Sequence, residues 1–288
     1  MSMQKPSFFN RQATAVTALF HGATLEELIA RARTAEFQGA DGIAVDLFRL
    51  PPEQRTEDNF RHLMREVRLP FMFLCYRNDQ WFGQDDEARQ ACLLAAAAAG
   101  AEVIDVMGDL YAPSPDELTL APAAIARQTK LIAEIHARGA KALISSHQHT
   151  LPARLTTQVL ETMRAQRARG ADICKLVAAV NGEEELLEAI KTTMTLNREL
   201  DVPFIHLTNG PYSRVHRFLG LSLGVAITFG VIGYEAGQLP SQPTITAFKA
   251  VQSNIHWNIK IFNSIGYHES LANLLRRQGT CLAAHGGT

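Results

Sequence analysis

Cysteine is scarce in this sequence of 288 residues, and its spacing excludes two classes of protein. The four cysteines are Cys75, Cys92, Cys174 and Cys281. None forms the CxxC spacing of a zinc ribbon or redox motif, and so few in so long a chain make no disulfide framework. Three of them lie in apolar runs, so we interpret them as buried, reduced side chains in a reducing compartment.

Net charge is nearly absent too, since 28 basic residues stand against 29 acidic ones. A net charge of −1 gives no general attraction to nucleic acid or to an anionic membrane. Residues 218–233 carry no charge, but the stretch is shorter than the roughly 18–20 residues of a spanning helix. The first six residues lack the apolar core of a secretory leader. We therefore expect a cytoplasmic protein that binds neither nucleic acid nor membrane.

A GxGxxG motif after the first apolar run is also missing, which argues against a dinucleotide-binding fold. What is present is a regular alternation of short apolar runs and helical patterns. The predicted strands are 14–20, 42–48, 70–76, 103–107, 141–147, 173–177, 204–208 and 226–232. The predicted helices are 25–38, 52–65, 87–99, 121–138, 155–169, 183–199, 213–221 and 244–258.

A glycine follows four of these helices, at the position where left-handed backbone ends a helix. They are Gly39, Gly100, Gly139 and Gly170. This repeated passage from helix to strand predicts an α/β protein, a (β/α)8 TIM barrel over residues 1–258. A C-terminal helical extension and tail should occupy 259–288, with a helix at 269–277. The alternative is an open, doubly wound sheet.

One lysine stands in a run that reads as a buried strand, Ile173-Cys-Lys175-Leu-Val177. A charged amine there is costly unless it is neutralised, paired or used. Burial lowers the pKa of a lysine, and a neutral amine is a nucleophile toward ketones. The preceding strand ends in His147. A lysine and a histidine base on neighbouring strands indicate a Schiff-base active site.

Other polar residues follow the predicted strands, where barrels carry their active sites. They are Asp46, Arg77, Asp109, Asn209 and Arg214. Two arginines at one barrel mouth suggest a substrate with a carboxylate or phosphate group. Each residue also has a plainer interpretation, in which the arginines form ion pairs and Asp46 caps a loop.

A metal site formed by His147, His149 and His206 is conceivable. No helical HxxxH spacing and no carboxylate motif supports it, so we expect no metal.

Several of these segments together resemble one known family. They are Ile144-Ser-Ser-His147, Gly170-Ala-Asp-Ile-Cys-Lys175, Ser213-Arg214 and a late Pro-x-Gln. The sequence is similar to type I 3-dehydroquinate dehydratase, a family of (β/α)8 barrels of the shikimate pathway that are generally dimeric. The resemblance covers roughly residues 14–256.

The resemblance implies roles for individual residues. Lys175 matches the Schiff-base lysine, and His147 matches the histidine that transfers protons. Arg214 matches the arginine that holds the substrate carboxylate, while Arg77 and Gln242 match further substrate contacts. No metal or organic cofactor is implied.

One wall of the implied pocket departs from the family pattern. The family motif Glu-x-Arg-x-Asp here reads Gly42-Ile-Ala44-Val-Asp46, so only the aspartate remains. The acidic residue that orients the histidine falls at Trp81, with Asp79 nearby. Strand seven carries Leu207 and Asn209 where methionines are usual. We expect Asp46, Trp81 and Asn209 to face the substrate in this altered wall.

The sequence thus predicts a homodimeric carbon–oxygen lyase that acts on a small carboxylated cyclic ketone. In this hypothesis Lys175 forms an imine and His147 transfers protons, converting 3-dehydroquinate to 3-dehydroshikimate. The altered wall leaves two alternatives open. One is a divergent Schiff-base lyase for another cyclic oxo acid, and the other is a catalytically inactive sensor of a shikimate-type metabolite.

Overall fold

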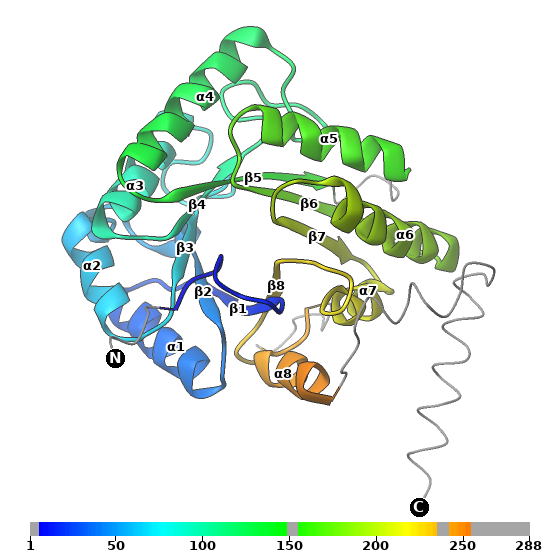
Figure 1. The fold of residues 1–288 in the computed structure, drawn as a ribbon. Helices are drawn as coiled ribbons and strands as arrows, with labels where there is room; N and C mark the ends of the chain where they lie inside the picture. The colour runs from blue at the N-terminus through cyan, green and yellow to red at the C-terminus, as the bar shows by residue number, and fades with distance from the viewer. Residues whose placement is uncertain (1–5, 149–154, 235–241, 255–288) are drawn as a thin grey trace, which may run out of the picture.

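Eight parallel strands surround a central axis in the computed structural model, which describes residues 6–148, 155–234 and 242–254 (Figure 1). The strands are β1 Ala15–Phe20, β2 Gly42–Asp46, β3 Phe71–Leu74, β4 Val103–Met107, β5 Lys141–Gln148, β6 Ile173–Ala179, β7 Phe204–Asn209 and β8 Ile227–Gly230. Their order is β7-β6-β5-β4-β3-β2-β1-β8. The sheet therefore curls until first and last strands pair, which confirms the barrel and excludes the open doubly wound sheet.

The barrel is nearly closed rather than fully laddered. β1 pairs with β8 from Ala15 with Ile227 to Ala18 with Gly230. Between β7 and β8, the Ala226 N–H donates to the Phe204 carbonyl, with N and O 2.9 Å apart. This bond joins the two strands at their starts.

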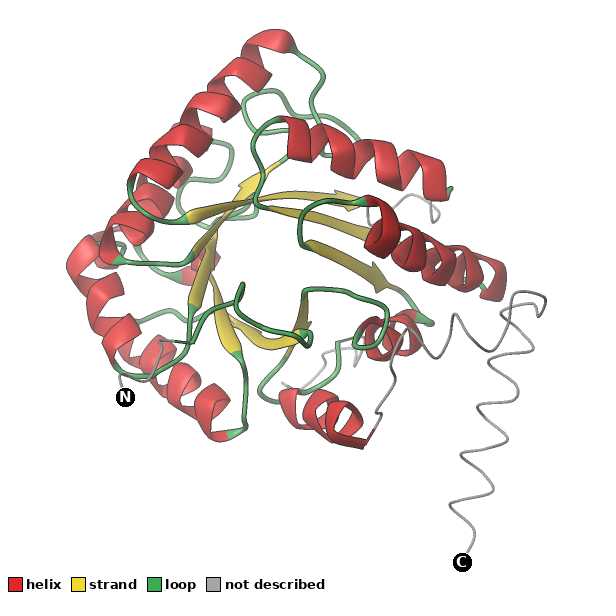
Figure 2. Ribbon diagram, in the orientation of Figure 1, coloured by secondary structure: helices red, strands yellow, loops and turns green. Residues whose placement is uncertain are grey.

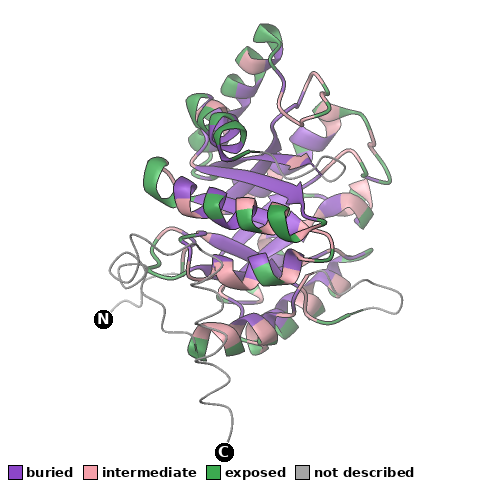
Figure 3. Cartoon of the chain, turned by 90° about the vertical axis from the view of Figure 1, so that its right-hand side faces the viewer, coloured by how far each residue is buried: buried purple, intermediate pink, exposed green. Residues whose placement is uncertain are grey.

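Helices cover the outside of the barrel, and their inner faces are buried (Figures 2 and 3). They are α1 Leu25–Phe37, α2 Glu57–Arg65, α3 Asp86–Ala99, α4 Pro122–Ala137, α5 Thr156–Ala168, α6 Glu183–Glu199, α7 Ser213–Gly220 and α8 Ile245–Asn254. The four glycines predicted to end helices have positive φ, between 82° and 106°, as expected for that position.

The predicted helix 52–65 is wrong in its first part. A short 3-10 turn, Pro52–Gln54, precedes α2, and the two are separated by a new helix start. Thr56 has extended backbone, and its hydroxyl accepts the N–H of Asn59 at 3.2 Å. This side-chain cap begins a second helix instead of continuing the first. The predicted helix 269–277, and the boundary at 258/259, lie outside the described residues.

The N-terminal segment covers the barrel at the end where the strands begin. Phe8 is buried there, and its N–H donates to the carboxylate of Glu102, the residue before β4, at 3.0 Å. A Cβ added to Gly42 would lie 2.2 Å from the Phe8 ring. Gly42 has no side chain, so the Phe8 ring can pack directly against the β2 backbone.

Cys75, Cys92 and Cys174 are buried and form no disulfide, which confirms that they are buried thiols, while Cys281 lies outside the described residues. Within the described ranges, no helix has the length and apolar character needed to cross a membrane.

Candidate active site

Lys175 lies in β6 and is almost fully buried, with 4% of its surface exposed. Its ammonium Nζ is 3.1 Å from Oδ2 of Asp105 in β4 and 2.7 Å from the hydroxyl of Tyr76, just beyond β3. A buried amine must be neutralised, paired or used, and in this structure Lys175 is paired with a carboxylate. The lysine is therefore held by one group in β4 and by one just beyond β3.

Asp105 is held as firmly as the lysine. Its Oδ1 accepts the hydroxyl of Ser145 at 2.6 Å, and its Oδ2 accepts the hydroxyl of Tyr76, also at 2.6 Å. Burial, and then the charge of Asp105, raises the pKa of Tyr76 well above its usual value. Tyr76 therefore stays protonated, so that it accepts from Lys175 and donates to Asp105.

His147 lies in β5 beside this cluster, and a glutamate orients it. Its Nδ1 is 2.8 Å from Oε2 of Glu117, and its backbone N–H donates to the same oxygen at 2.8 Å. Because a carboxylate only accepts, Nδ1 carries the proton in this contact. The histidine ring also meets the Tyr76 ring edge-on, with centroids 4.9 Å apart. Tyr76 thus contacts both residues predicted to be catalytic.

Asp46 ends β2 near the same cluster. Its carboxylate accepts the N–H of Phe48 at 3.3 Å, which confirms that it caps a turn. Burial raises its pKa to about 7, against the lowering effects of the Phe48 hydrogen bond and the Lys175 charge. The mouth therefore contains a carboxyl group that exchanges its proton near neutral pH.

Arg77 is engaged by two carboxylates. Its guanidinium pairs with Asp109 at 2.7 Å and with Asp86, in the first turn of α3, at 3.2 Å. Asp86 also pairs with Arg89, which is wholly buried. Arg77 therefore forms ion pairs in this structure, as the plainer interpretation of the sequence expected.

Arg214 and Gln242 are brought together by a tyrosine. Arg214, in the first turn of α7, contacts the hydroxyl of Tyr234 at 3.3 Å, and that hydroxyl donates to the Gln242 carbonyl at 3.1 Å. Asn209, at the end of β7, accepts from Arg217 at 3.0 Å. These residues form the β7–β8 side of the mouth.

Trp81 and Asp79 do not take the place of the histidine's acidic partner. Asp79 forms a buried ion pair with Arg55 at 2.6 Å and accepts the N–H groups of Trp81 and Phe82. The Trp81 side chain is 52% exposed. The orienting carboxylate is Glu117, which comes from the loop after β4 instead.

The histidine trio does not form a metal site on the described residues. His206 hydrogen-bonds the hydroxyl of Thr193 in α6 at 2.8 Å, so it faces the helix layer and not the barrel interior. Burial lowers its pKa to about 4. His149 lies outside the described residues, and the described part of the chain contains no group of three possible metal ligands.

Sequence reasoning missed Tyr76, Asp105 and Glu117. Asp105 carried a usable signal, because it is a second charge inside a buried run, Val103-Ile-Asp-Val-Met107. Opposite charges in two buried strands predict a pair. Glu117 carried none, since it lies in an irregular loop at a left-handed φ of 46°.

The fold and this cluster define a (β/α)8 barrel whose interior carries a lysine-centred polar site. The family profile described as Type I 3-dehydroquinase matches residues 17–258, and the chain belongs to that family. The 3-dehydroquinate dehydratase of Klebsiella pneumoniae is 27% identical over 256 residues, which cover 84% of this chain and 94% of the relative. Such relatives are lyases by name, and the family predicted from the motifs is confirmed.

Two solved structures have the same fold. The type I 3-dehydroquinate dehydratase of Clostridium difficile gives a TM-score of 0.71 at 15% identity, covering 84% of this chain and 92% of that one. The 3-dehydroquinate dehydratase of Geobacillus kaustophilus gives 0.69 at 18% identity, covering 84% and 91%.

Proposed function

We propose that the protein dehydrates 3-dehydroquinate to 3-dehydroshikimate through an imine on Lys175, with His147 as acid and base. The observation that carries the proposal is the position of Tyr76, which hydrogen-bonds the lysine amine and packs against the histidine ring. The amine and the imidazole therefore lie on either side of one tyrosine. A reaction in which one group attacks a carbonyl and the other removes a proton from the adjacent carbon requires such proximity.

The amine must lose a proton before it attacks. Asp105 Oδ2 lies 3.1 Å from Nζ and accepts that proton, either directly or through the Tyr76 hydroxyl. The neutral amine then forms a C–N bond with the ketone carbon. The proton held by Asp105 then passes to the carbinolamine hydroxyl, which leaves as water, and an iminium ion forms.

The iminium ion withdraws electrons and acidifies the adjacent C–H bond. His147 removes this proton through Nε2, since Glu117 holds Nδ1–H, and the electron pair forms an enamine. The protonated histidine then donates to the β-hydroxyl group, which leaves as water. Water finally hydrolyses the product iminium and releases Lys175. Two waters leave and one enters, so the net reaction is loss of one water.

The substrate carboxylate is assigned to Arg214, beside Gln242 and Asn209 on the β7–β8 side of the mouth. Bidentate pairing with a guanidinium suits a planar carboxylate. Asp46 would meet a substrate hydroxyl, and Arg77 would act by holding its loop through Asp86. Trp81, whose side chain is half exposed, stays a predicted substrate contact. Arg214→Ala is expected to raise KM about tenfold or more with a smaller change in kcat.

Trapping with borohydride tests the imine directly. Protein mixed with 3-dehydroquinate and reduced should gain the ligand mass on the peptide that contains Lys175. Lys175→Ala should gain none, whereas Lys141→Ala, which removes an exposed lysine from the same barrel, should be modified normally. Absence of an adduct in the unaltered protein would overturn the proposal.

A different cyclic oxo acid is the second candidate substrate, favoured by the β2 wall. Gly42 is covered by Phe8, and Ala44 has no polar atom to recognise a ring hydroxyl. Comparing adduct formation and enone absorbance for 3-dehydroquinate and a ring with fewer hydroxyls decides between them. Homodimer formation and a cytoplasmic location stay predictions, and light scattering of the purified protein tests the first.

A further inference from the structure

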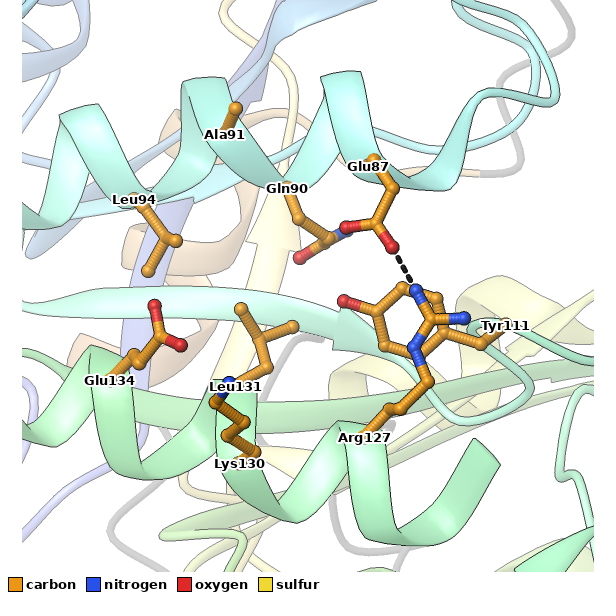
Figure 4. Close-up of a pocket in the computed structure, with 9 residues that line it drawn as sticks. All are labelled: Glu87, Gln90, Ala91, Leu94, Tyr111, Arg127, Lys130, Leu131 and Glu134. Carbon is orange, nitrogen blue, oxygen red and sulfur yellow. Dashed lines mark hydrogen bonds and ion pairs between the residues drawn. The ribbon is translucent and has the colours of Figure 1, made fainter. Parts of the chain in front are cut away.

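A cavity of about 310 Å³ lies between α3 and α4, on the outside of the barrel (Figure 4). Its size is at the lower end of the range for small-molecule sites, enough for a single ring with substituents. None of the residues assigned to the proposed reaction lines it. Its occupancy can therefore be tested without reference to catalysis.

The side-chain amide of Gln90 is buried at the cavity without a hydrogen-bond partner among the described residues. Its side chain extends from α3 toward α4, and the residue is only 3% exposed (Figure 4). Both amide atoms, Oε1 and Nε2, are buried, and neither has a hydrogen-bond partner within the described part of the chain. Burying such groups unpaired is unfavourable, and a leucine would fill the position without that penalty. A donor and an acceptor side by side match the edge of another amide.

One wall of the cavity is an aromatic ring held in place. The Arg127 guanidinium lies over the Tyr111 ring, 3.8 Å from its centroid, and pairs with Glu87 (Figure 4). The backbone N–H of Tyr111 donates to Asp86 at 2.8 Å. Arginine and glutamate therefore pair with each other, and the guanidinium and the Asp86 hydrogen bond both contact the residue that carries the ring.

The remaining walls supply apolar contact and one positive charge. Leu94 and Leu131 line the cavity from the two helices. Lys130 also lines it and makes no ion pair with any described residue, whereas Glu134 is within 3.8 Å of Arg138. Lys130 is thus the lining cation that no described carboxylate pairs with, so it can face an anionic group on a ligand.

We propose that this cavity binds a single-ring aromatic carboxamide that carries a carboxylate. The ligand amide pairs with Gln90 through two hydrogen bonds, its ring packs against Tyr111 and the leucines, and its carboxylate faces Lys130. Each contact uses a group that the folded chain leaves unsatisfied or exposed in the cavity.

The test measures binding of benzamide and 4-carbamoylbenzoate to the full chain by calorimetry or ligand-observed NMR. Both should bind the unaltered protein, the second more tightly. Gln90→Leu should weaken both by about tenfold or more, because each loses two hydrogen bonds. Lys130→Ala should weaken only 4-carbamoylbenzoate, by roughly twofold to fivefold, since an exposed ion pair contributes little.

Thermal unfolding of Gln90→Leu separates binding from folding. The variant should be as stable as the unaltered protein or more so, because it buries no unpaired amide. If neither probe binds at millimolar concentration, or if Gln90→Leu binds both as well as the unaltered protein, the proposal is wrong. Should Gln90→Leu fail to fold, Gln90→Met replaces it, and unchanged affinity in that variant has the same meaning.

Discussion

Lys175→Met is the substitution that tests the central cluster most sharply. The side chains of Lys175 and Asp105 are 5% and 0% exposed, and their charged atoms are 3.1 Å apart. At an effective dielectric constant of about 20, this separation corresponds to roughly 5 kcal/mol of attraction. Removing one member of such a pair costs about 3–5 kcal/mol, because the other charge stays buried. Tyr76 and Ser145 still donate to Asp105, so we expect a loss near 3 kcal/mol.

The double variant Lys175→Met/Asp105→Asn identifies the cause of that loss. With both charges removed and the volumes nearly kept, the free energy of unfolding should return to within about 1 kcal/mol of the original. Lys141→Met is the matched control, because its lysine pairs with Asp172 at 3.2 Å but is 50% exposed. It should cost less than about 1 kcal/mol. Urea unfolding measures all four proteins, and a double variant no more stable than Lys175→Met would refute the buried-pair reasoning.

Three further substitutions have defined outcomes. Glu117→Gln should lower kcat about tenfold to a hundredfold and leave KM nearly unchanged, because it disturbs the base and not the binding of substrate; steady-state kinetics would contradict this if the loss fell on KM. The pKa of Asp46 is about 7 in the folded state, against an ordinary value of 3.8, so between these pH values the folded state binds a proton that the unfolded state does not. The free energy of unfolding therefore falls as pH rises from 3.8 to about 7, by at most roughly 1.4 kcal/mol per pH unit. Asp46→Asn should flatten that slope in unfolding at pH 5, 6 and 7, and an unchanged slope would exclude Asp46 as its source. Gly42→Ala should cost about 1–3 kcal/mol in thermal unfolding because its Cβ meets Phe8, whereas Gly233→Ala, with nothing within 4 Å, should be nearly neutral.

The barrel was predictable because its signals are local and repeated. Each strand is a short apolar run, and glycine ends four of the helices, so all eight strands were found within a few residues of their bounds. The error at 52–65 has the opposite origin. Thr56 begins a new helix inside a segment whose overall pattern is helical, and a cap of this kind depends on one side-chain conformation.

The site was only half predictable, for a physical reason. Lys175 and His147 carry signals in their own strands, as a charge in an apolar run and a histidine at a strand end. Their partners are defined by distance across the barrel. Asp105 is two strands from Lys175, and Glu117 reaches His147 from a loop whose composition indicates only a turn. Periodicity describes which face a residue is on, but it does not say which residue lies opposite.

The partners of Lys175 also bear on whether the site serves catalysis or ligand sensing. A sensor for a carboxylated ketone would gain from a cation, yet it would need no buried acceptor for the cation's proton. A buried lysine–aspartate pair also adds little to the stability of the fold, because the cost of desolvating both charges offsets much of their attraction. Asp105 and Tyr76 give the ammonium a route to neutrality, and Glu117 separately fixes the tautomer of His147. Two oriented proton-transfer groups that meet at one tyrosine ring favour a reaction in which the amine attacks and the imidazole removes a proton from the neighbouring atom.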